Sequence, residues 1–301
     1  MPINIPKLLP ARSILEQENI FLMEKDRATT QDIRPLNILI LNLMPDKERT
    51  ETQLLRLLSN SPLQVSVDFI HTETYQAKNV QKSHLEKFYL TFSDIKDKRY
   101  DGMIITGAPI EHLAFEEVDY WDELVTILDW TNNHVTSTLH ICWGAQAALY
   151  HHYNIGKIKR NKKISGIFAH QLLIPTNKLV RGINDEFSVP HSRHTDADYQ
   201  AIEAHPDLSI LDCSEQAGPF LIVSNNERHI MITGHIEYDA DTLSREYHRD
   251  LKKGLPIHMP TNYYPNNNIN NQPINRWRST AYLIFSNWLN YFVYQETPFQ
   301  W

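Results

Sequence analysis

The stretch Ser137-Thr-Leu-His-Ile-Cys-Trp-Gly-Ala-Gln-Ala-Ala148 is the part of the chain that most directly indicates its fold. Residues 137–141 are apolar or β-branched and predict a strand, whereas the small residues from Gly144 onward predict the start of a helix. Cys142 lies at the corner between the two. This arrangement is typical of a nucleophile elbow, a tight turn that presents one side chain above the edge of a sheet. A buried structural cysteine at a strand end would give the same local pattern.

The chain before Cys142 alternates short apolar segments with amphipathic ones. This alternation predicts an α/β fold with a mostly parallel sheet flanked by helices. In such sheets the chemistry lies at the carboxyl ends of the strands, which is where Cys142 and the turn 107–111 are expected. The predicted strands are 37–43, 64–70, 100–106 and 137–141, and the predicted helices are 48–58, 81–89 and 119–132.

The second half of the chain predicts shorter strands and two more helices. The strands are 164–168, 171–174, 208–211, 220–224 and 229–233; helices at 239–253 and 276–295 flank a long loop. We expect residues 36–301 to form one α/β domain. Residues 1–35, with their prolines and mixed charges, predict an arm packed on that domain. Whether this arm makes a subunit contact, and hence a homodimer, is left open by the sequence.

Composition excludes several classes of function. The chain has 301 residues, 42% of them hydrophobic, and a formal net charge of −7 without a basic cluster, so we expect neither nucleic acid nor a membrane surface as partner. It lacks an apolar stretch long enough for a membrane span, and its first residues do not resemble a signal peptide. Its two cysteines cannot form a disulfide framework, so a cytoplasmic location is expected.

A cysteine nucleophile requires a base and a group that orients the base, and the chain offers both. His235 and Glu237 follow the predicted strand 229–233 directly. In an extended segment an i, i+2 pair shares one face, so Glu237 can orient the His235 ring. His-x-Glu by itself is a weak signal, but after a cysteine elbow it predicts a Cys142–His235–Glu237 triad.

The fifteen histidines also raise the question of a metal site. His191 and His194 have an i, i+3 spacing that a metal could use. No Cys or carboxylate accompanies them at the spacing of a zinc site, so we expect no metal.

Longer motifs extend the comparison beyond the triad. Cys142-Trp-Gly-Ala-Gln146 and Gly234-His-Ile-Glu237 resemble the class I glutamine amidotransferase-like superfamily, although His140 stands where its members usually have the first glycine of Gly-x-Cys-x-Gly. The remaining motifs resemble the homoserine O-acyltransferases of methionine biosynthesis. They are 41–47 (Leu-Asn-Leu-Met-Pro-Asp-Lys), 50–53, 105–109, 139–146, 190–195 (Pro-His-Ser-Arg-His-Thr), 234–238, 247–249, 285–291 and 293–295, and together they cover essentially the whole chain.

This resemblance implies a role for each site residue. Cys142 would carry the acyl group as a thioester, His235 would accept the proton, and Glu237 would orient His235. The backbone N–H of Trp143, with a second from the turn 107–110, would bind the oxyanion. Lys163, Ser192 and Arg249 fall where the family places substrate contacts; without the family they would be interpreted as a charged-loop residue, a turn residue and a helix-surface ion pair.

The resemblance also implies the substrates. Homoserine would be the acceptor and an acyl-CoA the donor, with no further cofactor. In the family, the residue at the position of Glu111 is associated with the choice of donor, and glycine there goes with succinyl. A carboxylate at this position would repel a succinyl group, so we expect acetyl-CoA. A solvated Glu111 paired with His112 is the alternative. A homoserine O-succinyltransferase and a glutamine amidotransferase or related cysteine hydrolase stay open as alternative functions.

Overall fold

A computed structural model describes residues 3–6, 8–18, 20, 22–23, 34–74 and 82–298. Its main sheet has the strand order β10-β12-β13-β7-β6-β3-β4-β1-β2, with β5 paired to β4. The strands from β13 to β2 run parallel, and β12 and β10 are antiparallel. They are β1 Ile3–Asn4, β2 Leu22–Met23, β3 Leu36–Leu41, β4 Val65–Ile70, β5 Tyr89–Leu90, β6 Tyr100–Ile105, β7 Val135–Ile141, β10 Leu208–Ile210, β12 Leu221–Ser224 and β13 His229–Ile232. The expected mostly parallel sheet is confirmed.

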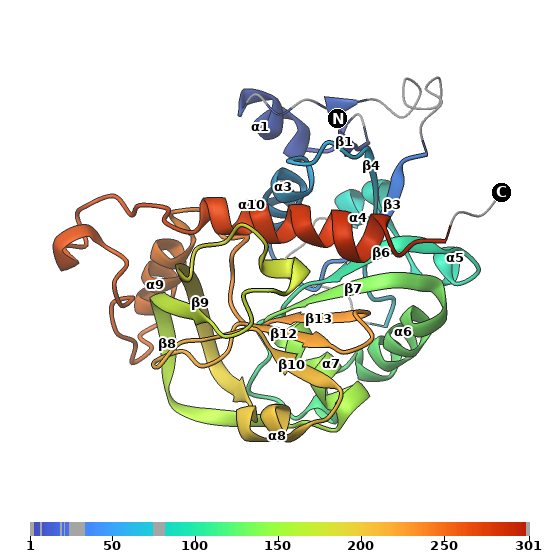
Figure 1. Cartoon of the computed structure of the whole chain (residues 1–301). Helices are drawn as coiled ribbons and strands as arrows, with labels where there is room; N and C mark the ends of the chain where they lie inside the picture. Colours follow the sequence, from blue (N-terminus) through green and yellow to red (C-terminus); the bar gives the residue numbers. More distant parts are fainter. Residues whose placement is uncertain are drawn as a thin grey trace.

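Helices cover both faces of this sheet (Figure 1). Helices α1, α3 and α10 pack on one face, and α6, α7 and α8 pack on the other. The helices are α1 Ala11–Gln17, α3 Lys47–Leu58, α4 Lys82–Phe88, α5 Phe92–Ile95, α6 Trp121–His134, α7 Trp143–Tyr153, α8 Tyr199–Ala204, α9 Thr242–Lys252 and α10 Arg278–Asn287, which continues as a π-helix over Trp288–Tyr294. Short 3₁₀ turns lie at Phe115–Glu117, Lys178–Val180 and Pro265–Asn267.

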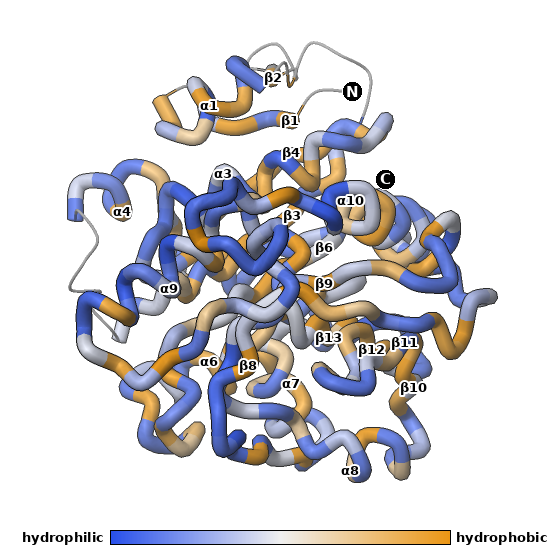
Figure 2. The backbone as a smooth tube through the Cα atoms, turned by 90° about the vertical axis from the view of Figure 1, so that its left-hand side faces the viewer, coloured by the Kyte–Doolittle hydropathy of each residue, from blue (hydrophilic) through white to orange (hydrophobic). Residues whose placement is uncertain are grey.

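The central strands are apolar on both faces because both faces are covered. In β3, Ile38 and Ile40 face the core under α3 and α10, whereas Leu39 and Leu41 face the core under α6 and α7. Figure 2 shows the resulting pattern, with hydrophobic residues gathered along the inner strands and hydrophilic ones on the outer segments. Continuous apolar runs are the sequence signature of parallel strands buried in this way.

A second sheet was not correctly predicted. The expected strands 164–168 and 171–174 are parts of one long strand, β8 Lys157–Leu172, which pairs with β9 Glu186–Ala197 and β11 Asp212–Cys213. The alternatives that the sequence left open without the family resemblance, a charged loop over residues 157–163 and a turn at Ser192, do not hold, because these residues lie in β8 and β9. The outer part of β8 is solvent-exposed, so its charged side chains hide the strand pattern; a register shift between Lys159 and Ile164 interrupts it further.

Candidate active site

Cys142 lies at a strained turn between β7 and α7. Its backbone has φ 52° and ψ −113°, a conformation that non-glycine residues rarely adopt. The Cys142 amide donates to the carbonyl of Ile232 at the end of β13 (2.7 Å), which holds the turn against the neighbouring strand. This geometry is that of the predicted nucleophile elbow.

Two glycines make room around the elbow. A Cβ on Gly144 would lie 2.8 Å from the carbonyl oxygen of Thr106 and 2.9 Å from that of Ile105, so only glycine lets α7 begin this close to β6. A Cβ on Gly107 would lie 3.2 Å from the Cys142 Cβ and 3.6 Å from the Trp143 amide nitrogen. The turn after β6 therefore passes directly beside the elbow. Trp143 starts α7, and the first amides of a helix have no partner within it, which suits oxyanion binding.

His235 and Glu237 meet Cys142 at the carboxyl ends of β7 and β13. The charge of the Cys142 sulfur acts on the buried His235 ring, and the ring Nδ1 lies 2.7 Å from Glu237 Oε1. The two residues lie in a turn rather than in the extended segment that was expected, and a Tyr238 N–H to His235 carbonyl bond (3.2 Å) closes that turn. The pairing is thus as predicted, but the backbone that produces it is not.

The charge state of His235 suits a thiolate partner. Burial lowers its pKa, but the Cys142 sulfur and the Glu237 carboxylate more than offset this and raise the pKa well above its ordinary value. The Tyr238 ring stacks on the imidazole with centroids 4.2 Å apart and the planes 17° apart, which restricts its rotation. A protonated imidazole beside a thiolate is the arrangement that activates a cysteine at neutral pH.

The three predicted substrate contacts come from three elements and meet at α9. Ser192 of β9 donates its hydroxyl to Glu246, whereas Lys163 of β8 donates to Asp250 (3.3 Å). Arg249 Nε also donates to Asp250 (2.8 Å). The structure therefore brings Lys163, Ser192 and Arg249 to one place by means of two carboxylates that lie one helical turn apart.

Sequence reasoning missed Glu246, although it completes this network. Glu246 Oε1 accepts from the Tyr238 hydroxyl (2.8 Å), and Oε2 lies 3.7 Å from Lys163 Nζ. Because Tyr238 stacks on His235, a chain of contacts runs from Ser192 through Glu246 and Tyr238 to His235, the predicted base. The i, i+4 spacing of Glu246 and Asp250 beside Arg249 is the signal that could have revealed it.

Glu111 is bound to β9 rather than solvated beside His112. Its Oε2 accepts from the backbone amide of His194 and from that of Thr195 (3.1 Å). The Thr195 hydroxyl in turn donates to Gln146 of α7 (2.9 Å). Glu111 thus joins the turn after β6 to the second sheet and places a carboxylate at that junction.

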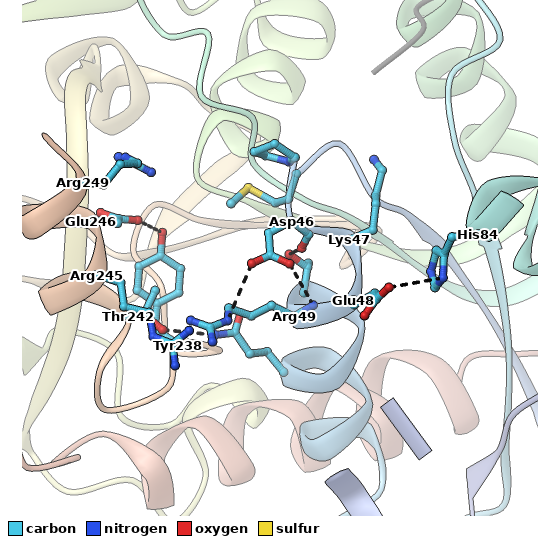
Figure 3. Close-up of a pocket in the computed structure, with 14 residues that line it drawn as sticks. Asp46, Lys47, Glu48, Arg49, His84, Tyr238, Thr242, Arg245, Glu246 and Arg249 are labelled. Atoms are coloured by element: carbon cyan, nitrogen blue, oxygen red, sulfur yellow. Dashed lines mark hydrogen bonds and ion pairs between the residues drawn. The ribbon is translucent and has the colours of Figure 1, made fainter. Parts of the chain in front are cut away.

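Two cavities lie beside neighbours of Cys142 and His235, and Met44, Pro45 and Lys47 line both. The larger, about 610 Å³, lies between the start of α3 and α9 and is bordered by Tyr238 (Figure 3). The smaller, about 350 Å³, is bordered by Ala108 to Ile110 after β6. Ala108, which follows Gly107 beside the elbow, lines the smaller cavity, and Tyr238, which stacks on His235, lines the larger one.

Lys47, another residue that sequence reasoning missed, stands where the two cavities meet. Its amine donates to the carbonyl of Asn42. Burial lowers its pKa to about 8, and the attraction of Glu51 opposes that shift only in part. A lysine in this range can change charge near neutral pH.

His191 and His194 do not form a metal site. Residues three apart in a strand point to opposite faces. His191 Nε2 lies 2.9 Å from His170 in the core, whereas the His194 ring packs on His112, with centroids 4.7 Å apart. Over the described ranges, no three His, Cys, Asp or Glu side chains are grouped so that they could hold a metal ion. None of the helices described is both long and apolar enough to cross a membrane.

Comparison with known proteins identifies the family. The family model described as homoserine O-succinyltransferase (HTS) matches residues 2–299. The chain belongs to this family. It is therefore an enzyme of the homoserine O-acyltransferase class. The relatives it resembles carry the name homoserine O-acetyltransferase: those of Geobacillus kaustophilus and Bacillus subtilis are 60% and 56% identical, and each match covers 100% of both chains. That of Lysinibacillus sphaericus is 59% identical, over 100% of this chain and 97% of its own.

Solved structures of similar fold are glutamine amidotransferases. One from Thermotoga maritima aligns with a TM-score of 0.58 and 12% identity, covering 85% of this chain and 97% of its own. One from Methylobacillus flagellatus aligns with a TM-score of 0.55 and 11% identity, covering 86% of this chain and 95% of its own. The similarity shows that the HTS family shares the class I glutamine amidotransferase-like fold.

Proposed function

We propose that this protein transfers an acetyl group from acetyl-CoA to the hydroxyl of L-homoserine, giving O-acetyl-L-homoserine for methionine biosynthesis. The observation that carries the proposal is the Cys142 thiol on its strained elbow, beside a His235 ring that Glu237 orients. The names of the relatives support homoserine as acceptor and acetyl as the transferred group.

The reaction would proceed in two half-reactions. The Cys142 thiolate attacks the thioester carbonyl, the bond to the coenzyme A sulfur breaks, and His235 gives that sulfur its proton. The homoserine hydroxyl then loses its proton to His235 and attacks the acyl-Cys142, which releases the cysteine. The tetrahedral oxyanion in each step would be bound by the Trp143 amide and an amide of the turn beside Gly107. The Arg249 guanidinium would bind the homoserine carboxylate.

A mass measurement tests the acyl-enzyme. Incubation with acetyl-CoA alone should add one acetyl group to Cys142, and homoserine should then remove it. Cys142→Ser should give no turnover, because a serine hydroxyl is a much weaker nucleophile than a thiolate. Glutamine should leave neither an adduct nor released ammonia. Full turnover by Cys142→Ser, or hydrolysis of glutamine, would contradict the proposal.

The choice of acyl donor is tested at Glu111. A succinyl carboxylate near Glu111 would meet a like charge, so we expect wild type to prefer acetyl-CoA and Glu111→Gly to shift kcat/KM toward succinyl-CoA by at least about tenfold. Glu111→Gly also removes the bonds to β9. Glu111→Gln is therefore the matched control, since it removes the charge and can still accept from those amides. A wild type that prefers succinyl-CoA, or a ratio that moves in neither variant, would rule out acetyl selection by Glu111.

A further inference from the structure

The larger cavity contains more positive charge than homoserine recognition uses. Arg249 on α9 lies beside Lys163 and Asp250, where a small amino acid would bind. Arg245 lines the same cavity one helical turn earlier, and Arg49 lines it from α3 on the opposite wall (Figure 3). The function of these two guanidinium groups is not explained by the acceptor.

The proposed mechanism requires the donor to use this cavity as well. His235 protonates the departing coenzyme A sulfur and later deprotonates the homoserine hydroxyl, so these two atoms must occupy the same position in turn. Tyr238 stacks on His235 and lines the larger cavity, which therefore opens next to the base. Its volume of about 610 Å³ lies within the range of sites for drug-sized ligands and far exceeds the size of homoserine.

The ion pairs of Arg49 and Arg245 leave guanidinium N–H donors free to bind an anion. Arg49 lies 3.8 Å from Asp46, and Arg245 lies 2.6 Å from Asp241. The Arg245 pair is solvent-exposed and therefore weak, and in the Arg49 pair the arginine is 25% and the aspartate 67% exposed. A guanidinium has five N–H donors, of which each pair uses only part. The first turn of α3 also faces the cavity, and its amide dipoles favour a negative ligand, although the Asp46 carboxylate already accepts from the Arg49 amide. Glu48 opposes this in part, but its side chain is 57% exposed.

We propose that Arg49 and Arg245 bind the phosphate groups of coenzyme A while its thioester reaches Cys142. The inference rests on the proposed function, because it assumes an acyl-CoA donor. Phosphate is the strong anion of that donor, whereas homoserine is a zwitterion without net charge. Guanidinium groups bind phosphate in a bidentate manner. Homoserine and the phosphates thus occupy different parts of one cavity.

A donor without phosphates separates this role from catalysis. Wild type and the double variant Arg49→Ala/Arg245→Ala are assayed with acetyl-CoA and with acetyl-pantetheine, which has the same thioester but no phosphate. We expect the double variant to lose at least about tenfold in kcat/KM for acetyl-CoA and to keep its kcat/KM for acetyl-pantetheine and its KM for homoserine. The KM of wild type for acetyl-CoA should rise with salt more steeply than that of the variant.

Arg181→Ala is the control, because Arg181 is an exposed arginine that donates to Tyr291 outside the cavity (2.8 Å). Arg181→Ala should leave kcat/KM unchanged for both acetyl-CoA and acetyl-pantetheine. Thermal unfolding shows whether each variant is folded. If the double variant is not folded, the comparison is repeated with Arg245→Ala alone, which removes only an exposed ion pair on α9. An equal loss with both donors would assign the two residues to the catalytic machinery, and no loss with either would place the phosphates elsewhere; both results overturn the inference. Absence of transfer by wild type from either donor would instead contradict the proposed function.

Discussion

At the scale of single residues, Cys142, the proposed nucleophile, is held in a strained backbone conformation. A positive φ at a non-glycine residue costs on the order of 1–3 kcal/mol and persists only where the surroundings enforce it. Here the Ile232 carbonyl holds the Cys142 amide, and Gly144 lets α7 start against β6. The strain thus directs the thiol toward the place where His235 stands.

The first residue-scale prediction concerns His235 and Glu237. His235→Asn should abolish acyl transfer, because Cys142 would lose the group that exchanges its proton. Glu237→Gln should lower kcat by up to about 10⁴-fold, since an amide does not hold the imidazole in the required tautomer. Steady-state kinetics with acetyl-CoA and homoserine measures both effects. Near-normal rates in both variants would place the catalytic base elsewhere, and unchanged thermal unfolding would show that the loss is not one of folding.

At the scale of elements, the second sheet and α9 bring the predicted substrate contacts together. Lys163 and Ser192 come from β8 and β9, and Glu246 of α9 contacts both. Neither β9 nor the outer half of β8 could be recognised in the sequence. Their strand character arises from pairing with each other, whereas polar and charged side chains are buried in succession along β9 and exposed in succession along the outer half of β8, so neither shows an apolar alternation.

A buried histidine cluster joins three other elements. His140 of β7, His152 of α7 and His229 of β13 lie together, with His140 Nε2 3.3 Å from His229 Nδ1 and the His152 and His229 rings 4.4 Å apart. His140 replaces the glycine that the superfamily usually has near the cysteine, and it belongs to this cluster rather than to the site. Burial lowers the pKa of His152 to about 4, assisted by His151 and opposed by Asp129. Burial, His152 and Arg228 lower that of His229 to about 3.

The cluster predicts a loss of stability in mild acid. In the unfolded chain these histidines bind protons below the ordinary histidine pKa of about 6.5, whereas in the folded protein they bind protons only below about pH 4. Unfolding is therefore favoured as the pH falls through this window. Above pH 6.5 the cluster has no such effect. Between pH 7 and pH 5, His152→Phe should lose about 2 kcal/mol less of its free energy of unfolding than wild type.

Urea unfolding at the two pH values measures this difference. His258→Phe is the control, because His258 is exposed and its substitution should leave the difference between the two pH values as in wild type. If His152→Phe and wild type lost the same free energy between pH 7 and pH 5, His152 would not be the source of acid sensitivity.

At the scale of the whole molecule, the structure separates stability from chemistry. The proposed catalytic groups lie at the carboxyl edge of the main sheet, whereas the C-terminal helix crosses one of its faces (Figure 1). Trp288 at the end of α10 is fully buried, and its indole N–H donates to Ser137 in the first half of β7 (3.1 Å). A Cβ on Gly102 would lie 3.1 Å from the Trp288 ring, so the helix packs directly on β6.

Trp288→Ala should therefore destabilise the protein without altering its chemistry. Loss of so large a buried side chain costs about 3–5 kcal/mol. We expect a clear fall in Tm, but acetylation of Cys142 at low temperature should stay within a few-fold of the wild-type rate. Tyr294→Ala, which truncates a side chain that is 55% exposed on the same helical segment, should change the Tm little. A folded Trp288→Ala variant without acylation activity would show that this helix also positions the site.

The sequence by itself determined what depends on neighbours along the chain. Apolar runs and helical periodicity located β3, β6, β7, α3, α6 and α10 to within a few residues, and the step from strand to small residues located Cys142. The pairing of His235 with Glu237 was also predicted, because the two are close in sequence. Tertiary structure decided the rest. Ser192, Glu246 and Tyr238 are brought together by hydrogen bonds between β9, α9 and the turn after β13, and Glu111 is bound by amides of β9. Such contacts join residues far apart in the chain and leave no periodicity, so only the folded backbone shows which side chains meet at the nucleophile.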